Sequence, residues 1–258
     1  MIIERATKDD HQMLKDLWKE VFNEEEAFLE RFFSTRIRYE HIFVAREEGA
    51  IVSALHALPS TYLQQGTEHD CSFIVGAATY APWRRKGIMG SLLQAVREAY
   101  SHPITLFPAV RPFYEANGYF TTSSLLQFPL GAMEETSVQV KPIVFSELNR
   151  IHRKAHEQNG ALLRDEQGWK FLTDGYETIA VQDGYAFLSE GKAVEAFTLT
   201  KEAAVQLLGL LSERQVTAVQ TLSTDPLAEL LGQEKAMPIP MGMSTDQSMR
   251  GVYIAEQY

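Results

Sequence analysis

The strongest pattern in the chain is the recurrence of apolar residues at intervals of three and four, which predicts amphipathic helices. It is clearest over residues 87–100, where these side chains share one face: Ile88, Met89, Leu92, Leu93, Val96 and Tyr100. A similar helix, capped by Thr7, reaches Phe22, and another begins after Asn23, which is predicted as its N-cap. Each helix is expected to bury its apolar face against a sheet.

Runs of apolar and β-branched residues predict the strands of the first half. They cover residues 2–6, 41–46, 51–63, 68–80, 104–107 and 119–130, with a brief helix at 111–117 that ends at Gly118. Pro59 lies inside one long run and has no N–H to donate, which predicts a strand edge or a bulge there.

The pattern partly restarts after a polar segment at 130–142, which predicts two domains, residues 1–135 and 136–258. The second half has predicted helices at 146–158, 165–172 and 200–211, the last capped by Thr200. Its predicted strands lie at 178–182, 185–189, 193–199 and 217–222. The methionine-bearing stretch that follows is predicted to be irregular, with its methionines in packing.

Composition narrows the class of protein. The 258 residues carry a formal net charge of -10, and the only run of three basic residues is Arg84 to Lys86, which argues against a nucleic-acid partner. Cys71 is the single cysteine, so no disulfide joins two parts of the chain. No apolar segment is long enough for a signal peptide or a membrane span, and a cytoplasmic protein without membrane contact is predicted. The seven histidines show no paired metal-ligand spacing, which predicts no metal site.

Residues 76–93 combine a strand end, a basic turn and a helix start. Arg84, Arg85 and Lys86 precede Gly87 and Gly90, so positive charge and free backbone N–H groups converge within one turn. The glycines leave space for a ligand to approach the backbone. This junction therefore predicts a phosphate-binding site.

Two segments resemble motifs of the GCN5-related N-acetyltransferases. Residues 84–89 are similar to the pyrophosphate motif Gln/Arg-x-x-Gly-x-Gly/Ala, except that Met89 stands where a small residue is usual. Residues 113–119 are similar to the segment Phe-Tyr-x-x-x-Gly-Phe/Tyr, about 30 residues further on. The similarity runs from about Ile3 to Phe128. Met89 points toward the branch resembling the mycobacterial enhanced intracellular survival acetyltransferase, whose sterol-carrier-like domain is expected to be absent here.

The resemblance implies an α/β (α+β) fold with a central mixed, mostly antiparallel sheet flanked by helices, and a smaller, partly similar second α/β domain. It also implies acetyl-CoA as cosubstrate, with the pantetheine arm beside residues 77–79 and an amide N–H there contacting the thioester oxygen. The implied contacts are Ala77, Ala78, Thr79, Arg84, Arg85, Lys86, Gly87, Ile88, Met89, Gly90, Ala109 and Phe113.

Tyr114 matches the family's tyrosine acid, which protonates the leaving thiolate. The base stays open between His56, which a strand would place near the acceptor, and the terminal carboxylate of Tyr258, as in the resembling branch. Weaker candidates are Glu68, His69, Asp70 and Glu115.

These features together predict an N-acetyltransferase that moves an acetyl group directly to a primary amine. The acidic net charge favours a cationic acceptor, either a small molecule such as a polyamine or an aminoglycoside-like compound, or a lysine-bearing peptide. Two alternatives remain: a non-catalytic acyl-CoA-binding or regulatory protein, and a module that binds an acidic protein through Arg84 to Lys86. A homo-oligomer is left open.

Overall fold

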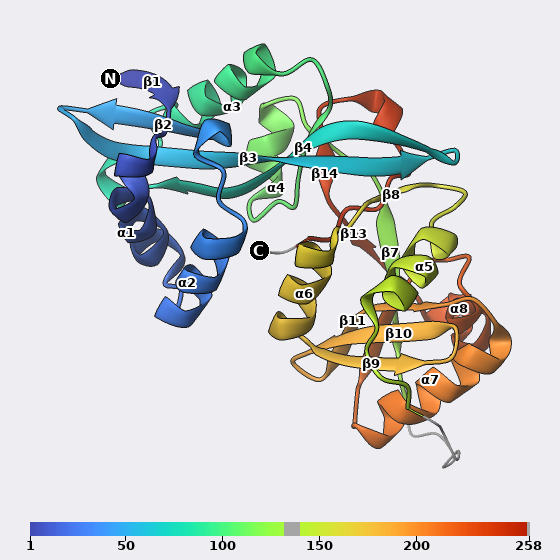
Figure 1. Cartoon of the computed structure of the whole chain (residues 1–258). Coiled ribbons are helices and arrows are strands. Elements are labelled where there is room, and N and C mark those ends of the chain that lie inside the picture. Colours follow the sequence, from blue (N-terminus) through green and yellow to red (C-terminus); the bar gives the residue numbers. More distant parts are fainter. Residues whose placement is uncertain (132–139, 257–258) are drawn as a thin grey trace.

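The computed structural model describes residues 1–131 and 140–256, and they form two mixed sheets with helices packed against both (Figure 1). The first sheet has the order β1-β2-β3-β4-β5-β14-β6, with β8 paired to β3. All its neighbours are antiparallel except β4 and β5. Its strands are β1 (Ile2–Arg5), β2 (Ile42–Glu47), β3 (Ala50–Gln64), β4 (Thr67–Thr79), β5 (Ile104–Leu106), β6 (Phe120–Thr121), β8 (Ala161–Leu162) and β14 (Met243–Ser244).

Helices cover both faces of the first sheet because their apolar stripes need burial. One face carries a core built around Trp18, Phe32 and Phe33, and the other a core around Leu92 and Val96. The helices are α1 (His11–Phe22), α2 (Glu26–Thr35), α3 (Ile88–Ala99) and α4 (Arg111–Ala116).

The second sheet has the order β13-β7-β12-β11-β10-β9, in which only β11 and β12 run parallel. Helix α7 packs on one core of this sheet and α5 and α6 contribute to the other. The elements are β7 (Ser124–Pro129), α5 (Phe145–Ala155), α6 (Glu166–Gly175), β9 (Glu177–Val181), β10 (Gly184–Ser189), β11 (Lys192–Thr198), α7 (Lys201–Glu213), β12 (Ala218–Thr221), α8 (Pro226–Leu231) and β13 (Met237–Pro240). The predicted fold class, a mixed α/β architecture with two sheets, is confirmed.

The two sheets exchange strands across the predicted boundary. β7 comes before residue 135 but belongs to the second sheet, whereas β8 and β14 come after it and belong to the first. The predicted strand at 119–130 is therefore two strands in different sheets. The stretch predicted to be irregular contains two strands. β13 pairs with β7 in the second sheet, and β14 lies between β5 and β6 in the first. The division at residue 135 itself lies outside the described residues and stays a prediction.

Several local predictions hold for physical reasons. Thr200 caps α7 by accepting a hydrogen bond from the Ala203 N–H at 3.1 Å. Pro59 lies where β3 has left β2, whose pairing ends at His56, so this part of β3 is an edge. Asn23 is a correction: it ends α1 in a left-handed conformation, with φ of 56°, and Glu25 is the N-cap of α2.

Candidate functional site

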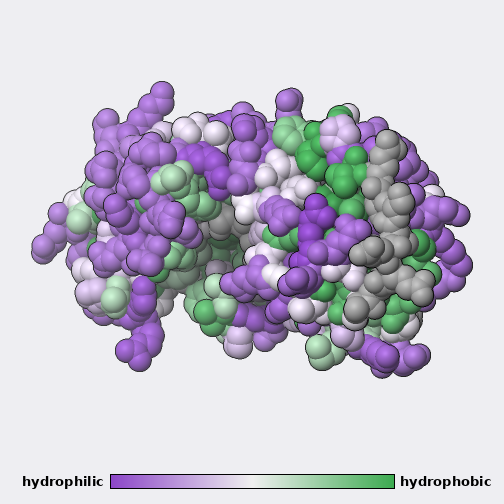
Figure 2. Space-filling view, turned by 90° about the horizontal axis from the view of Figure 1, so that it is seen from below, coloured by the Kyte–Doolittle hydropathy of each residue, from purple (hydrophilic) through white to green (hydrophobic). Residues whose placement is uncertain are grey.

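A cleft opens where β4 and β5 separate. The two strands pair in parallel only between residues 72–74 and 104–106, after which the chain leaves β5 at Phe107. Residues 75, 78 and 79 of β4 keep their partners on the β3 side, so the other edge of this stretch faces the cleft. Viewed from below, the surface is hollowed between the half that carries α1 and α2 and the half built on the second sheet (Figure 2). An extended ligand can add to such a free edge as a further strand.

A bulge at Gly76 shapes this edge. The register between β3 and β4 shifts here, since Ala54 pairs with Ala78 whereas His56 pairs with Val75. Gly76 has φ of +61°, and a Cβ at this position would lie 2.0 Å from Cζ2 of Trp18. Only glycine therefore lets the indole ring pack directly on the strand beside the cleft.

Replacing Gly76 with alanine is expected to lower the free energy of unfolding by about 2–4 kcal/mol, because a clash adds to the cost of positive φ. Gly49→Ala is the matched control: Gly49 also has positive φ, but nothing lies within 4 Å of its Cβ position. Urea titrations of the two variants compare the costs. Equal losses would show that Trp18 moves aside without penalty.

The first cavity, of about 480 Å³, lies between the β4 edge and the start of α3. Its lining includes ten of the twelve residues predicted to contact acetyl-CoA: Ala77, Thr79, Arg84, Arg85, Gly87, Ile88, Met89, Gly90, Ala109 and Phe113. Arg85 and Gly87 both have positive φ, and the N–H of Ser91 is the first to bond back to the turn, at Gly87. The N–H groups that precede Ser91 in α3 are thus available to an anion.

The remaining two predicted contacts do not line this cavity. Ala78 is buried, and its carbonyl accepts a hydrogen bond from the Ser53 hydroxyl at 2.9 Å. The Lys86 ammonium lies 4.7 Å from the centre of the Trp83 ring. Arg84 lines the cavity and also ties the basic turn to the end of β4, because its Nε donates to the Thr79 carbonyl at 2.9 Å.

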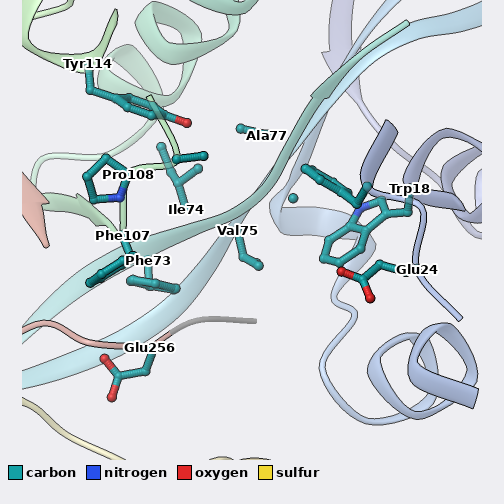
Figure 3. A pocket seen from close by; sticks show the side chains of 13 residues that line it. Trp18, Glu24, Phe73, Ile74, Val75, Ala77, Phe107, Pro108, Tyr114 and Glu256 are labelled. Atoms are coloured by element: carbon teal, nitrogen blue, oxygen red, sulfur yellow. The ribbon is translucent and has the colours of Figure 1, made fainter. Parts of the chain in front are cut away.

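Tyr114 lines both this cavity and a second one (Figure 3). It comes from α4, which ends at Asn117 and is followed by Gly118 with φ of +77°. Burial raises the pKa of the Tyr114 phenol to about 12. The hydroxyl therefore stays protonated at neutral pH, as a proton donor requires.

The second cavity, of about 310 Å³, continues from Tyr114 along β4 toward the first two helices. It shares Ala77, Ala109 and Tyr114 with the first cavity. Apart from the Tyr114 phenol, its ionisable lining among the described residues consists of two carboxylates, Glu24 and Glu256 (Figure 3). The cavity can therefore accept a positively charged group.

Glu24 lies in the short link between α1 and α2 and is half-buried. Burial, and then the charge of Glu25, raise the pKa of its carboxyl above the ordinary value, which makes it a better proton acceptor. Glu24 was not among the predicted site residues, because the sequence pattern places it in the first turn of the helix predicted after Asn23. The available signal was Asn23, a residue that tolerates the left-handed conformation and can end a helix.

Glu256 belongs to a buried network that joins the end of the described chain to the second sheet. Its Oε1 accepts from Nε of Arg164 at 2.7 Å, while both terminal nitrogens of Arg164 donate to Glu195 at 2.6 and 2.7 Å. The hydroxyls of Tyr185 and Tyr253 also donate to Glu195, each at 2.7 Å. One guanidinium thus neutralises two carboxylates only in part.

His56 does not line either cavity. It is fully buried beside Trp18, whose Nε1 donates to His56 Nε2 at 3.3 Å, and burial lowers the pKa of the imidazole to about 3. A base must reach the acceptor, and the alternation of β3 turns this ring into the core instead. The prediction of His56 as the base is therefore wrong.

The other predicted bases are placed elsewhere or are not described. Glu68 and Asp70 line neither cavity; they line an adjoining one of about 410 Å³, which shares Phe73 and Glu256 with the second cavity. His69 is exposed and stacks on Tyr62, and Glu115 is exposed on α4. Tyr258 lies outside the described residues, so its terminal carboxylate stays a prediction.

Two further features bear on the class of site. Within residues 1–131 and 140–256, no three acidic, cysteine or histidine side chains gather as metal ligands would, and no helix is long and apolar enough to cross a membrane. One histidine pair does have helical spacing: His152 on α5 and His156 at its C-cap lie one turn apart, with ring centres 4.6 Å apart. Both rings are buried against Phe197 and Tyr253.

Comparison with known proteins agrees with this geometry. Residues 3–122 match the family model described as the acetyltransferase (GNAT) domain, which is a little under half of the chain. No curated protein matches the sequence. The family match supports a GNAT acetyltransferase built on the first sheet, with transferase activity.

Solved structures resemble nearly the whole chain. A protein of unknown function from Enterococcus faecalis, described as a probable N-acyltransferase, has a TM-score of 0.73 at 18% identity, over 94% of this chain and 72% of its own. A GCN5-related N-acetyltransferase from Anabaena variabilis has a TM-score of 0.72 at 18% identity, over 94% of this chain and 72% of its own. Eis1 from Mycobacterium abscessus has a TM-score of 0.66 at 14% identity, over 95% of this chain and 73% of its own. At these identities the likeness is one of fold.

Proposed function

We propose that the protein is an acetyl-CoA-dependent N-acetyltransferase that acts on a primary amine of a cationic acceptor. The observation that carries this proposal is the position of Tyr114 on the wall common to two cavities. One cavity has the backbone donors and basic turn suited to a pyrophosphate, and the other has carboxylates suited to an ammonium group. A reaction between two substrates requires their meeting point to carry the proton donor.

In the proposed reaction, residues of both cavities take part. The acceptor nitrogen forms a bond with the acetyl carbonyl carbon, and the carbon–sulfur bond breaks. The Glu24 carboxylate takes one proton from the acceptor ammonium and passes it to solvent. Tyr114 gives its proton to the leaving sulfur, and the second proton that the nitrogen loses as the amide forms replaces it. A backbone N–H group among residues 77–79 stabilises the negative charge that develops on the carbonyl oxygen. Acetyl-CoA supplies the activated thioester, and its pyrophosphate is held at the start of α3.

The proposal is tested by binding and turnover measured separately. Calorimetry with acetyl-CoA and thiol release in the presence of a panel of amines are both expected to give signals. Binding without thiol release for any amine would favour a non-catalytic acyl-CoA-binding protein. No binding would favour the remaining alternative, a contact between the basic turn and an acidic protein.

Arg85→Ala is expected to weaken CoA binding about tenfold, because it removes a charged side chain from the cavity wall. Lys86→Ala removes the same charge one residue away, from a side chain that lies against Trp83 and not on the wall. Isothermal titration with CoA compares the two. Equal losses would mean that net charge alone, and not contact with the cavity, determines affinity.

Other parts of the prediction extend this proposal. The acidic net charge of -10 supports a cationic acceptor, and the single cysteine supports a cytoplasmic protein. We also propose that the chain belongs to the enhanced intracellular survival branch. The fold likeness to Eis1 and the presence of Met89 where the motif usually has a small residue support this proposal.

A further inference from the structure

The second cavity is an aromatic and aliphatic chamber with few polar side chains. Its wall includes five aromatic residues: Trp18, Phe22, Phe73, Phe107 and Tyr114. Apart from the Tyr114 hydroxyl and the Trp18 indole N–H, which bonds to His56, the polar side chains among its described lining residues are Glu24 and Glu256. Hydroxyl or amide groups of a ligand would therefore lose water there and find few partners.

The two carboxylates are not equivalent. Glu256 accepts from Arg164 at 2.7 Å and from the backbone N–H of Ala255 at 3.2 Å, so much of its charge is already paired. Glu24 has no hydrogen bond or ion pair within the described part of the chain. In Figure 3 the Glu24 carboxylate lies beside Trp18, whereas the Glu256 carboxylate lies beyond Phe73. The chamber therefore offers one available negative charge, at one end.

The volume of the second cavity also favours a small ligand. About 310 Å³ is at the lower end of the roughly 300–1,000 Å³ that small-molecule sites occupy. A bulky polycation or a folded peptide loop is too large to be enclosed by such a volume. The cavity fits a small molecule with one buried ammonium group.

We infer that the acceptor is a small primary amine on an apolar stem, an alkylamine or arylalkylamine, whose ammonium group pairs with Glu24 while its stem lies along Phe73 and Phe107. This inference rests on the proposed acetyl transfer and selects among its acceptors. A second cationic or hydroxyl group on the stem would lie against aromatic walls without a partner, and such acceptors are disfavoured.

An acyl chain is the other apolar group that could occupy this chamber. Its methylene groups would then surround Glu24 and remove that carboxylate from water without any compensating charge. An ammonium group provides that compensation. The unpaired carboxylate thus favours the acceptor over a long acyl chain.

The test measures kcat/KM from thiol release with acetyl-CoA and amines of matched length. Hexylamine and phenylethylamine are expected to exceed hexamethylenediamine about tenfold or more, because the diamine differs from hexylamine only in a second charged end. Spermidine, an aminoglycoside and a lysine peptide are expected to be poorer still. Equal or better rates with the diamine or the polycations would overturn the inference while leaving acetyl transfer intact. If none of the amines gave thiol release, both the inference and the proposed acetyl transfer would be overturned.

Glu24→Gln is expected to raise the KM for hexylamine about tenfold or more, to lower kcat because the proposed base is lost, and to leave CoA binding unchanged. Glu20→Gln, an exposed position on α1 outside the cavity lining, is the control with the same change of charge. Hexanoyl-CoA replaces acetyl-CoA in a further arm. A preference for hexanoyl-CoA, together with an unchanged KM in Glu24→Gln, would assign the chamber to the acyl chain instead.

Discussion

Tyr114→Phe is expected to lower kcat by about 10²-fold and to leave the affinity for acetyl-CoA nearly unchanged. The ring remains to fill both cavity walls, so the variant loses only the hydroxyl that protonates the leaving sulfur. Because burial raises the pKa of this phenol to about 12, its ionisation is not expected to limit kcat anywhere near neutral pH. Steady-state rates of thiol release and calorimetry with acetyl-CoA separate the two effects.

Tyr119→Phe is the matched control for this variant. Tyr119 packs edge-on against Tyr114, with ring centres 5.8 Å apart, but it lines neither cavity, and the Arg97 guanidinium lies 5.0 Å from the centre of its ring. Removal of the Tyr119 hydroxyl is expected to leave kcat within a factor of about two. If both variants kept full activity, Tyr114 would have no part in proton transfer.

The donor side of the site could be read from the sequence because its parts are adjacent in the chain. A strand end, a basic turn and a helix start between residues 76 and 93 must converge once each element forms. Tyr114 follows within one further strand and turn. A site built from adjacent segments can be predicted without knowledge of the tertiary fold.

The acceptor side could not be read in the same way. Its wall brings together the link after α1, the bulge in β4 and the end of the described chain at Glu256, three segments far apart in sequence. Glu24 was assigned to a helix because Asn23 suits either a cap that starts a helix or one that ends it. His56 was assigned to the site because alternation in a strand identifies two faces but not which face is core.

The strand exchange was also beyond sequence reasoning. β14 has two residues, and nothing in Met243 or Ser244 distinguishes a strand from a loop. Its place between β5 and β6 depends on pairing with Leu106 and Thr121, which lie more than a hundred residues away in the chain. This exchange bears on the proposed site, because it brings the end of the described chain to the second cavity.

Arg164→Met is expected to lower the free energy of unfolding by about 3–5 kcal/mol at neutral pH, because it leaves two buried carboxylates without their cation. Arg214→Met is the control: it breaks a solvent-exposed ion pair with Glu177 and is expected to cost under about 1 kcal/mol. Urea titration of the wild type and both variants gives the comparison. A cost for Arg164→Met as small as that of the control would show that the network adds little to stability.

The pH dependence of this cost distinguishes lost charge pairing from lost packing. Burial would raise the pKa of Glu195, but the charge and hydrogen bonds of Arg164 outweigh it and hold that pKa below the ordinary value. In the wild type this pairing stabilises the fold above the unfolded-state pKa and is lost as the pH falls through the folded one. Without Arg164 the buried Glu195 carboxyl protonates more readily than in the unfolded chain, so the difference in stability between variant and wild type is expected to narrow from about pH 7 to about pH 5. A constant gap would assign the cost to packing of the arginine side chain, which lies over the Trp169 ring at 4.8 Å.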